Sequence, residues 1–234
     1  MSEDLPVIVA WSGGKDSTLA LARLPPAYHV VALLTHLDTA HDRVSVHGTR
    51  HTLIERQAAA LGLPVQWVPL PPQPTNLVYE AALAAALAPY QAQGVRHIVY
   101  GDLFLADIRQ YRDAQLARLG WQGVYPLWGL DTQRLLQEFI AAGFRAVLTC
   151  VDTTQLACAF AGRAVDPALL ASLPPGCDPC GENGEFHTFV HDGPLFRWPV
   201  PVIAGAGAWQ VGRFCYYDLE VTPDADRIAL AEQH

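Results

Sequence analysis

Through residue 151, short apolar runs rich in Val, Ile and Leu alternate with segments whose apolar residues recur with a helical period. The runs occupy residues 5–10, 29–35, 65–68, 96–100 and 145–151. They lack the polar alternation of half-exposed strands, and such runs suit parallel strands that helices bury on both faces. This alternation of strands and helices predicts an α/β fold with a doubly wound parallel sheet.

The chain after residue 122 follows a different pattern. One more helix is expected at 131–142, but turn-rich sequence containing Pro174, Pro175 and Gly176 follows the run at 145–151. Aromatic and β-branched runs at 185–190 and 213–220 predict short antiparallel strands. We therefore expect two domains: residues 1–122 with the parallel sheet, and residues 123–234 with a smaller α+β fold.

Local signals predict where some helices begin and end. Thr52 and Glu55 have the spacing of a capping box, and Gly62 can end the same helix in the left-handed conformation. After a proline-rich loop at 69–74, either Thr75 or Asn76 can cap the next helix.

Composition restricts the class of protein and its partners. Of the 234 residues, 51% are hydrophobic and 16% are charged, which excludes disorder for most of the chain. The formal net charge of -8 argues against nucleic acid or an anionic membrane as a partner. No apolar run reaches the roughly 18 residues of a membrane span, and the acidic start differs from a signal peptide. We expect a cytoplasmic enzyme whose five cysteines are reduced thiols.

Between the first expected strand and the next helix lies the segment Ser12-Gly13-Gly14-Lys15-Asp16-Ser17. Its glycines allow a tight turn and a close approach to an anion, and the helix N-terminus adds partial positive charge. Lys15 can neutralise phosphate, the serine hydroxyls can bind phosphate oxygens, and Asp16 can hold Mg²⁺ or orient the loop. Val9 stands where a Walker loop requires glycine, so the segment predicts another kind of phosphate loop.

This segment resembles the pyrophosphate loop, or PP-loop, of the N-type ATP pyrophosphatases. Further motifs occur in the order seen in the diphthine–ammonia ligase-like family: Gly101-Asp102-Leu103, Pro126-Leu127-Trp128 and Gly181-Glu182-Asn183-Gly184-Glu185-Phe186-His187-Thr188. The resemblance implies a Rossmann-like fold of the adenine nucleotide alpha hydrolase type, with residues 1–122 binding ATP and residues 123–234 binding the substrate. It also implies an amide ligase that uses ATP and Mg²⁺, adenylates the carboxylate of diphthine, and lets ammonia displace AMP.

The same resemblance implies roles for individual residues. The ATP-binding residues would be Ser12, Gly13, Gly14, Lys15, Asp16, Ser17, Gly101 and Asp102, with Asp16 as a Mg²⁺ ligand. The catalytic residues would be Lys15, Asp16, Glu182 and Glu185. The substrate-binding residues would be Glu182, Asn183, Glu185 and Thr188. From the residues alone, the two glutamates could bind ammonium, assist its deprotonation or hold a second Mg²⁺.

Two positions depart from the family pattern Gly-Glu-Gly-Gly-Glu-x-Glu-Thr. Asn183 replaces a glycine, and His187 replaces the last glutamate, so a fixed negative charge becomes a mostly neutral imidazole. This form is similar to bacterial relatives whose substrate is unassigned. The sequence is therefore consistent with two kinds of acceptor, a small-molecule carboxylate or a protein side-chain carboxylate. A nitrogen donor would be the second substrate. The resemblance is also compatible with a homodimer.

Other residues could bind a metal ion, cover the nucleotide site or form surface ion pairs. Zinc-like spacings occur in the set Cys177, Cys180, His187 and His191. The six residues between the two pairs form a shorter gap than zinc fingers use, which disfavours zinc. A polar loop over the nucleotide site is expected to carry His36, His41, His47 and His51. Arg109 and Asp113 have the spacing of an ordinary surface ion pair on a helix.

Two other functions could use the same loop. A tRNA-modifying adenylase would need a basic face, which the acidic net charge disfavours. A nucleotide sensor without turnover would bind ATP and release no AMP.

Overall fold

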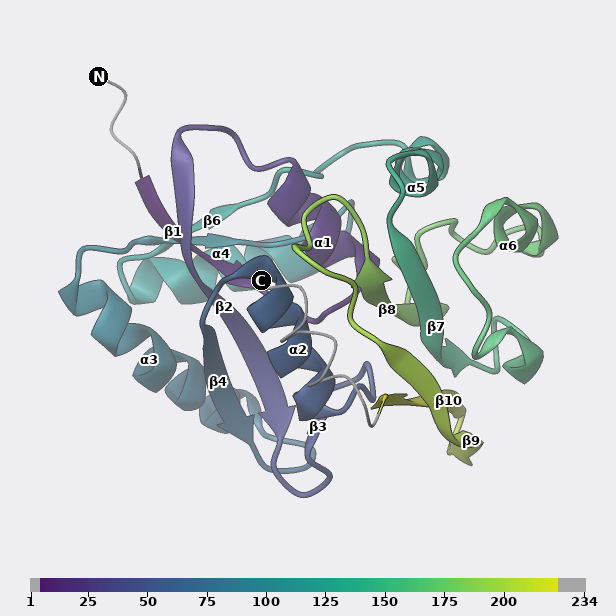
Figure 1. Ribbon diagram of the computed structural model, residues 1–234. Helices are drawn as coiled ribbons and strands as arrows, with labels where there is room; N and C mark the ends of the chain where they lie inside the picture. The colour runs from purple at the N-terminus through teal and green to yellow at the C-terminus, as the bar shows by residue number, and fades with distance from the viewer. Residues whose placement is uncertain (1–4, 223–234) are drawn as a thin grey trace.

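The computed structural model describes residues 5–222 and contains two sheets (Figure 1). The first sheet has parallel strands in the order β4-β2-β1-β5-β6. These strands are β1 (Leu5–Ala10), β2 (Tyr28–Asp38), β4 (Val65–Leu70), β5 (His97–Val99) and β6 (Gln122–Val124). The short β3 (Arg43–Val44) pairs antiparallel with the end of β2. The predicted doubly wound α/β fold is confirmed.

Helices cover both faces of this sheet. On one face, Ile8 of β1 shares a buried cluster with Leu83 of α3 (Asn76–Ala92) and Leu116 of α4 (Ala106–Arg118). On the other face, its neighbours in β1 share a second cluster with α1 (Lys15–Ala22) and α2 (His51–Leu61). Successive strand side chains point to opposite faces, so the continuous apolar run of β1 supplies both clusters. Within residues 5–222, no helix combines the length and apolar character needed to cross a bilayer.

The helix ends agree with two of the three local predictions. Gly62 ends α2 at φ 71°, and the side chain of Thr75 caps α3 by accepting a hydrogen bond from the Val78 N–H. The predicted capping box is wrong, because α2 begins at His51 and Thr52 already lies inside the helix. The residue at the cap, Arg50, makes no capping hydrogen bond through its side chain and instead binds Asp218.

The second sheet is antiparallel, as the turn-rich sequence predicts, with the order β8-β7-β10-β9. Its strands are β7 (Arg145–Asp152), β8 (Phe186–Asp192), β9 (Val202–Val211) and β10 (Phe214–Val221). The run at 145–151 therefore forms β7 of this sheet, which corrects its expected place in the parallel series. The last parallel strand is β6, whose three residues are too few to give a clear apolar pattern.

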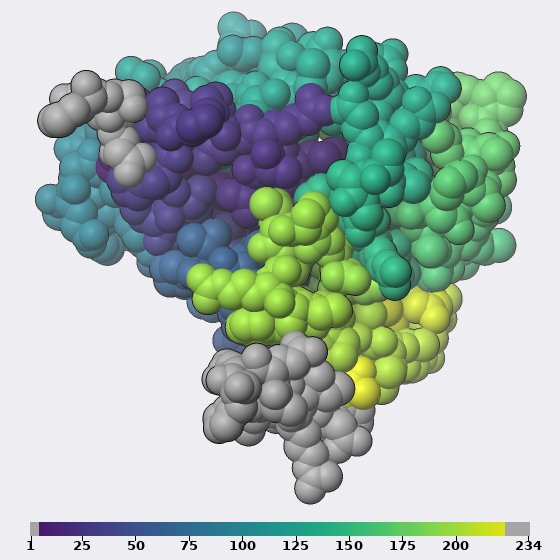
Figure 2. Space-filling model, turned by 45° about the horizontal axis from the view of Figure 1, so that its top comes forward, coloured from purple at the N-terminus to yellow at the C-terminus, as the bar shows by residue number. Residues whose placement is uncertain are grey.

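Three short helices accompany the second sheet. They are α5 (Thr132–Ala141), the 3₁₀ helix η1 (Cys158–Phe160) and α6 (Pro167–Ser172). One buried cluster joins Leu19 of α1 to Phe139 of α5 and Phe189 of β8, so the two sheets share a core. Figure 2 shows green segments from the C-terminal part of the chain packed against the purple N-terminal segment. The expected boundary after residue 122 falls within β6, and the division into two domains stays a prediction.

The expectation that all five cysteines are reduced is wrong. Cys158 of η1 and Cys215 of β10 form a disulfide across a separation of 57 residues, while Cys150, Cys177 and Cys180 are free. The pairing depends on the position of η1 beside β10, and this contact between distant segments leaves no signature in cysteine spacing.

Candidate functional site

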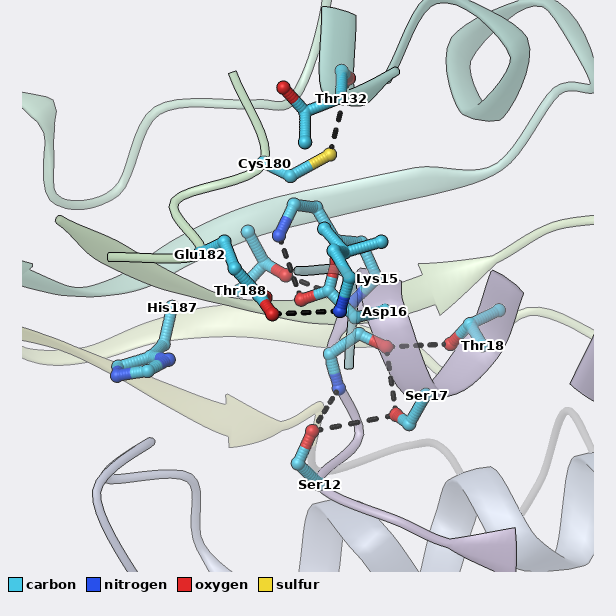
Figure 3. A network of polar contacts seen from close by, with 12 residues as sticks. Ser12, Lys15, Asp16, Ser17, Thr18, Thr132, Cys180, Glu182, His187 and Thr188 are labelled. Carbon is cyan, nitrogen blue, oxygen red and sulfur yellow. Dashed lines mark hydrogen bonds and ion pairs between the residues drawn. The ribbon is translucent and has the colours of Figure 1, made fainter. Parts of the chain in front are cut away.

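The glycine turn after β1 is held by steric and hydrogen-bonding constraints. Gly13 adopts φ 79°, and a Cβ there would lie 2.6 Å from Ile54 Cδ1, so only glycine fits. Within the turn, the Gly14 N–H donates to Ser12 Oγ, and Ser17 Oγ donates to the Gly14 carbonyl at 3.0 Å (Figure 3). Helix α1 then begins at Lys15, so the predicted strand-turn-helix arrangement of the loop is present.

Strand β8 fixes this turn from the C-terminal part of the chain. The Val190 N–H donates to the Gly13 carbonyl at 2.9 Å, and the Lys15 N–H donates to Thr188 Oγ1 at 3.0 Å. Gln57 of α2 adds a third bond, because its Nε2 donates to the same Gly13 carbonyl at 2.9 Å. Thr188, expected to bind substrate, is therefore engaged in holding the N-terminal end of α1 (Figure 3).

Lys15 is completely buried and is neutralised by its neighbour. The residue is 1% exposed, and Nζ lies 2.9 Å from Asp16 Oδ2. Burial opposes the charged form of Lys15, but Asp16, with smaller contributions from Cys180 and Glu182, outweighs burial and raises the pKa of the lysine. Burial also raises the pKa of Asp16, and Lys15 partly offsets this effect. The second oxygen of Asp16, Oδ1, is buried without a protein partner in the described structure.

A cavity of about 680 Å³ opens at the carboxyl ends of β1, β2 and β5. This edge is where doubly wound sheets bind ligands, and the volume suits a small molecule. Predicted site residues from three distant segments line it together: Ser12, Asp16, Ser17, Gly101, Asp102 and Glu182. The residues Gly13, Gly14, Lys15, Asn183, Glu185 and Thr188 are not part of the lining.

Gly101 and Asp102 contribute in different ways. A Cβ on Gly101 would lie 2.7 Å from the backbone carbonyl of Asp16, so glycine lets the end of β5 approach α1. Asp102 lines the cavity and forms an ion pair with Arg112 of α4, with Nε 2.9 Å from Oδ2. Burial raises the pKa of Asp102, and Arg112 opposes that rise.

Arg112 is a cavity residue that the sequence did not reveal, since its position on the inner side of α4 depends on packing. Its guanidinium lies 4.4 Å from the centre of the Tyr100 ring. Nearby on the same helix, Arg109 and Asp113 form the predicted ion pair at 3.6 Å.

The two glutamates of the glycine-rich turn face different surroundings. Glu182 lines the cavity and accepts a 2.7 Å hydrogen bond from the Leu103 N–H, and burial raises its pKa to about 7. Glu185 is 1% exposed, and its Oε1 accepts hydrogen bonds from the Asp178 N–H and from Asn183 Nδ2. The structure thus presents one carboxylate to the cavity and uses the other to hold the turn.

The predicted histidine loop lies over the site only in part. His36 and His47 line the cavity, whereas His41 and His51 face the carboxylates of Asp38 and Asp42. Burial lowers the pKa of His36 to about 4.

A second imidazole lies beside His47. The ring of His187, which also lines the cavity, has its centre 4.4 Å from that of His47. Burial lowers the pKa of His187 to about 4, and burial also lowers the pKa of His47. Both rings are therefore neutral at pH 7.

The four residues with zinc-like spacing do not come together. Cys180 Sγ donates to the Thr132 carbonyl at 3.3 Å (Figure 3). His187 instead packs beside His47. In the part of the chain that the structure describes, no three His, Cys, Asp or Glu side chains are grouped to hold a metal ion.

The fold and cavity define an α/β protein with a phosphate-type loop at the edge of a parallel sheet. Two family models match nearly the whole chain: the diphthamide synthase N-terminal domain over residues 5–120 and the diphthamide synthase C-terminal domain over residues 131–222. The chain therefore belongs to the diphthamide synthase family.

Curated relatives named diphthine–ammonia ligase are similar to this chain at low identity. The protein of Bos taurus is 28% identical over 210 residues, covering 80% of this chain and 78% of the relative. The protein of Danio rerio is 27% identical over 215 residues, covering 80% of this chain and 82% of the relative. The match to the Schizosaccharomyces pombe protein is 33% identical over 84 residues, covering 34% of this chain and only 14% of that protein.

One solved structure is similar over part of the chain. It is described as a predicted subunit of tRNA methyltransferase from Methanocaldococcus jannaschii. The TM-score is 0.38 at 20% sequence identity, and the match covers 61% of this chain and 77% of that one.

Proposed function

We propose that this protein is an ATP-dependent ligase that cleaves ATP to AMP and pyrophosphate and uses the resulting acyl adenylate to form an amide. The observation that carries the proposal is the shared cavity, in which the phosphate-type loop at Ser12–Ser17 and Glu182 from the far end of the chain line one space. Membership of the diphthamide synthase family supports an amide-forming reaction.

In this proposal, the turn at residues 12–17 binds the β and γ phosphates through its backbone N–H groups and the N-terminus of α1. Asp16 lines the cavity, and among residues 5–222 its buried Oδ1 has no protein partner, which fits a Mg²⁺ ligand. When bound, Mg²⁺ would neutralise charge on the phosphate oxygens. Lys15, paired with Asp16, holds that carboxylate in place.

The reaction proceeds in two steps. An oxygen of the acceptor carboxylate attacks the α phosphorus, the bond to the β phosphate breaks, and pyrophosphate leaves. The nitrogen donor then attacks the acyl carbon, an amide forms, and AMP leaves with the bonding electrons. Glu182 is placed to receive the proton that the nitrogen loses, since its pKa of about 7 matches neutral conditions.

The residues that line the cavity also indicate which part of the chain would bind the acceptor. Residues 1–122 would bind ATP, and residues 123–234 would contribute Glu182 and His187 to the acceptor. Asn183, Glu185 and Thr188 would act by shaping the turn and the loop, since they lie outside the cavity lining. Diphthine is one candidate acceptor, and a small-molecule carboxylate is the other. The nitrogen donor would be ammonia, and a homodimer remains compatible with this arrangement.

The test is product analysis. The protein is incubated with ATP, Mg²⁺, ammonium and a panel of carboxylic acids, and nucleotides are separated by chromatography. AMP and pyrophosphate in equal amounts are expected, with a stimulated rate for the true acceptor. ADP and orthophosphate as the main products would contradict the proposal. ATP binding without any AMP would identify a sensor, and stimulation by tRNA alone would identify a tRNA-modifying adenylase.

A further inference from the structure

Two histidine side chains form one wall of the cavity, and we call this pair the histidine wall. His47 comes from the loop after β3 and His187 comes from β8, and the centres of their rings lie 4.4 Å apart. The ring of His47 also lies close to the glycine turn, because a Cβ on Gly14 would be 3.3 Å from its Cε1. In the proposed function, the histidine wall therefore borders the place where the nucleotide and the acceptor meet.

The loop that carries His47 is held in a strained conformation. Val46 has a φ of 69°, which is unfavourable for a β-branched residue and persists only where contacts hold the backbone. Arg43 supplies such contacts, since its Nη1 donates to the Gly48 carbonyl at 2.7 Å and to Asp218 Oδ1 at 3.0 Å. The structure thus fixes the position of His47 at the cavity.

His47 has an unused polar atom in this wall. Its Nδ1 is buried, and no hydrogen-bond partner for it exists within residues 5–222. Native structures rarely keep such an atom unpaired without a ligand, water or ion. A neutral imidazole nitrogen accepts or donates according to its tautomer, and a hydroxyl group can match either case. The atom therefore suits an uncharged polar group of a ligand.

The surroundings of the histidine wall disfavour a cation. Burial lowers the pKa of both rings, and the charge of Lys15 adds to this effect, so the wall is uncharged. The carboxylates that line the cavity have partners of their own: Asp16 pairs with Lys15, Asp102 pairs with Arg112, and Glu182 accepts a backbone N–H. A quaternary ammonium group against this wall would lose water without gaining a counter-ion.

We propose that the histidine wall binds the substituent next to the reacting carboxylate of the acceptor, and that it selects an uncharged polar substituent over a quaternary ammonium group. This inference rests on the proposed function, because it assumes that a carboxylate reaches the nucleotide in this cavity. The acceptor class is then carboxylic acids with a hydroxyl or another uncharged hydrogen-bonding group near the carboxylate. Diphthine has a quaternary ammonium group beside its carboxylate and lies outside this class.

The experiment uses three acids of nearly the same shape: 3-hydroxy-3-methylbutanoate, 3,3-dimethylbutanoate and glycine betaine. The first acid carries a hydroxyl, the second has only methyl groups, and the third places a positive charge at the same branching centre. Release of AMP is measured with each acid in the presence of ATP, Mg²⁺ and ammonium, and KM for the acid is separated from kcat.

Three variants are compared with the wild-type protein. His47→Leu removes the unpaired nitrogen and keeps apolar bulk. His187→Glu adds a negative charge to the wall, at the position where the family pattern has glutamate. His41→Glu is the matched control, because it adds the same charge at a side chain that is 67% exposed and outside the cavity lining. Circular dichroism and thermal unfolding check that each variant is folded.

The wild-type protein is expected to show the lowest KM for the hydroxy acid and the highest for betaine. The hydroxyl should lower KM about fivefold relative to 3,3-dimethylbutanoate, and the positive charge should raise it about tenfold or more. His47→Leu should remove the advantage of the hydroxy acid and still reject betaine. His187→Glu should reverse the order of betaine and 3,3-dimethylbutanoate, and His41→Glu should behave as wild type.

Several results would overturn the inference and leave the proposed function intact. One is a wild-type protein that uses betaine as well as 3,3-dimethylbutanoate, and another is the same acid preference in His187→Glu and His41→Glu. A third is AMP release with other carboxylic acids of the panel but with none of these three. Absence of AMP from the wild-type protein with every acid would instead remove the proposed function together with this inference.

Discussion

The backbone N–H of Lys15 donates a 3.0 Å hydrogen bond to Oγ1 of Thr188, which lies 173 residues further along the chain. The first N–H groups of a helix have no partner within the helix and must find one elsewhere. Here the partner is a strand of the second sheet, so the shape of the phosphate-type loop depends on the C-terminal part of the protein.

Thr188→Val tests this dependence. Valine has the shape of threonine but cannot accept the hydrogen bond, so a buried N–H loses its partner. We expect the free energy of unfolding to fall by about 1–3 kcal/mol and ATP binding to weaken. Urea denaturation and calorimetry measure the two effects. Thr52→Val on the exposed side of α2 is the control and should change stability by less than about 0.5 kcal/mol. Equal behaviour of the two variants would mean that the bond has no role.

Substitutions at Gly14 should show a graded effect on nucleotide binding. Its φ of -89° suits any residue, but a Cβ would lie 3.0 Å from the Thr188 carbonyl oxygen and 3.3 Å from His47 Cε1. Gly14→Ala should weaken ATP binding, and the branched side chain of Gly14→Val should abolish it with the fold retained. Calorimetry measures ATP binding, and circular dichroism checks that each variant is folded. Unchanged ATP affinity in folded Gly14→Val would refute the assignment of the phosphate loop.

The pH profile of turnover should follow Glu182. Its pKa is raised by burial to about 7, and it acts as a base only when ionised. Activity with the true acceptor should therefore rise as the pH increases through about 7. Glu182→Gln should lower kcat by about 10²-fold or more and remove this rise, with ATP binding nearly normal.

Glu185→Gln is the matched control for that experiment. Glu185 lies outside the cavity lining and binds the Asp178 N–H, so its variant should keep the shape of the pH profile even if the rate falls. If Glu182→Gln instead loses ATP affinity only when Mg²⁺ is present, the carboxylate holds the ion and the proton-acceptor role is wrong.

Glu182 should also make stability depend on pH. Its pKa is higher in the folded protein than the usual value of 4.5, so the folded state binds the proton more tightly than the unfolded state does. Stability from this group is present below pH 4.5 and is lost as the pH rises through about 7. Glu182→Gln should therefore melt at a higher temperature than wild type at pH 8 and at a similar temperature at pH 4. Calorimetric Tm values that differ equally at both pH values would contradict this linkage.

Asp218 should stabilise the contact between β10 and the first sheet. It is 2% exposed, and its carboxylate accepts hydrogen bonds from Arg43 at 3.0 Å and from Arg50 at 2.6 Å. Burial favours the protonated form, but the two guanidinium groups outweigh it and lower the pKa of Asp218. Asp218→Asn should lower the free energy of unfolding at pH 7 by about 3 kcal/mol, measured with urea.

The sign of the pH effect follows from the lowered pKa of Asp218. The stabilisation is present above the usual value of 3.8 and is lost as the pH falls below it. The difference between wild type and Asp218→Asn should therefore shrink in acid. Glu220→Gln is the control, since this partner of Arg50 is 41% exposed and should cost less than about 1 kcal/mol. A constant difference at all pH values would show that the charge of Asp218 is not responsible.

Local sequence determined the features that depend on short stretches of chain. The apolar runs of β1, β2 and β4, the left-handed end of α2 at Gly62 and the glycine turn before Lys15 could all be predicted, because each follows from the residues within one strand or one turn. The family could be recognised for the same reason, since its motifs are short and occur in a fixed order.

Tertiary structure decided which of these residues face the cavity. Glu182 and Glu185 look alike in the sequence, but the packing of their turn points one carboxylate at the cavity and the other at the Asp178 N–H. Arg112 and Tyr79 enter the site because α4 and α3 pack on the same face of the sheet, a relation between segments far apart in the chain. Sequence patterns report local conformation and burial, whereas the direction of a side chain toward a ligand depends on contacts between distant segments, and only the folded chain contains those contacts.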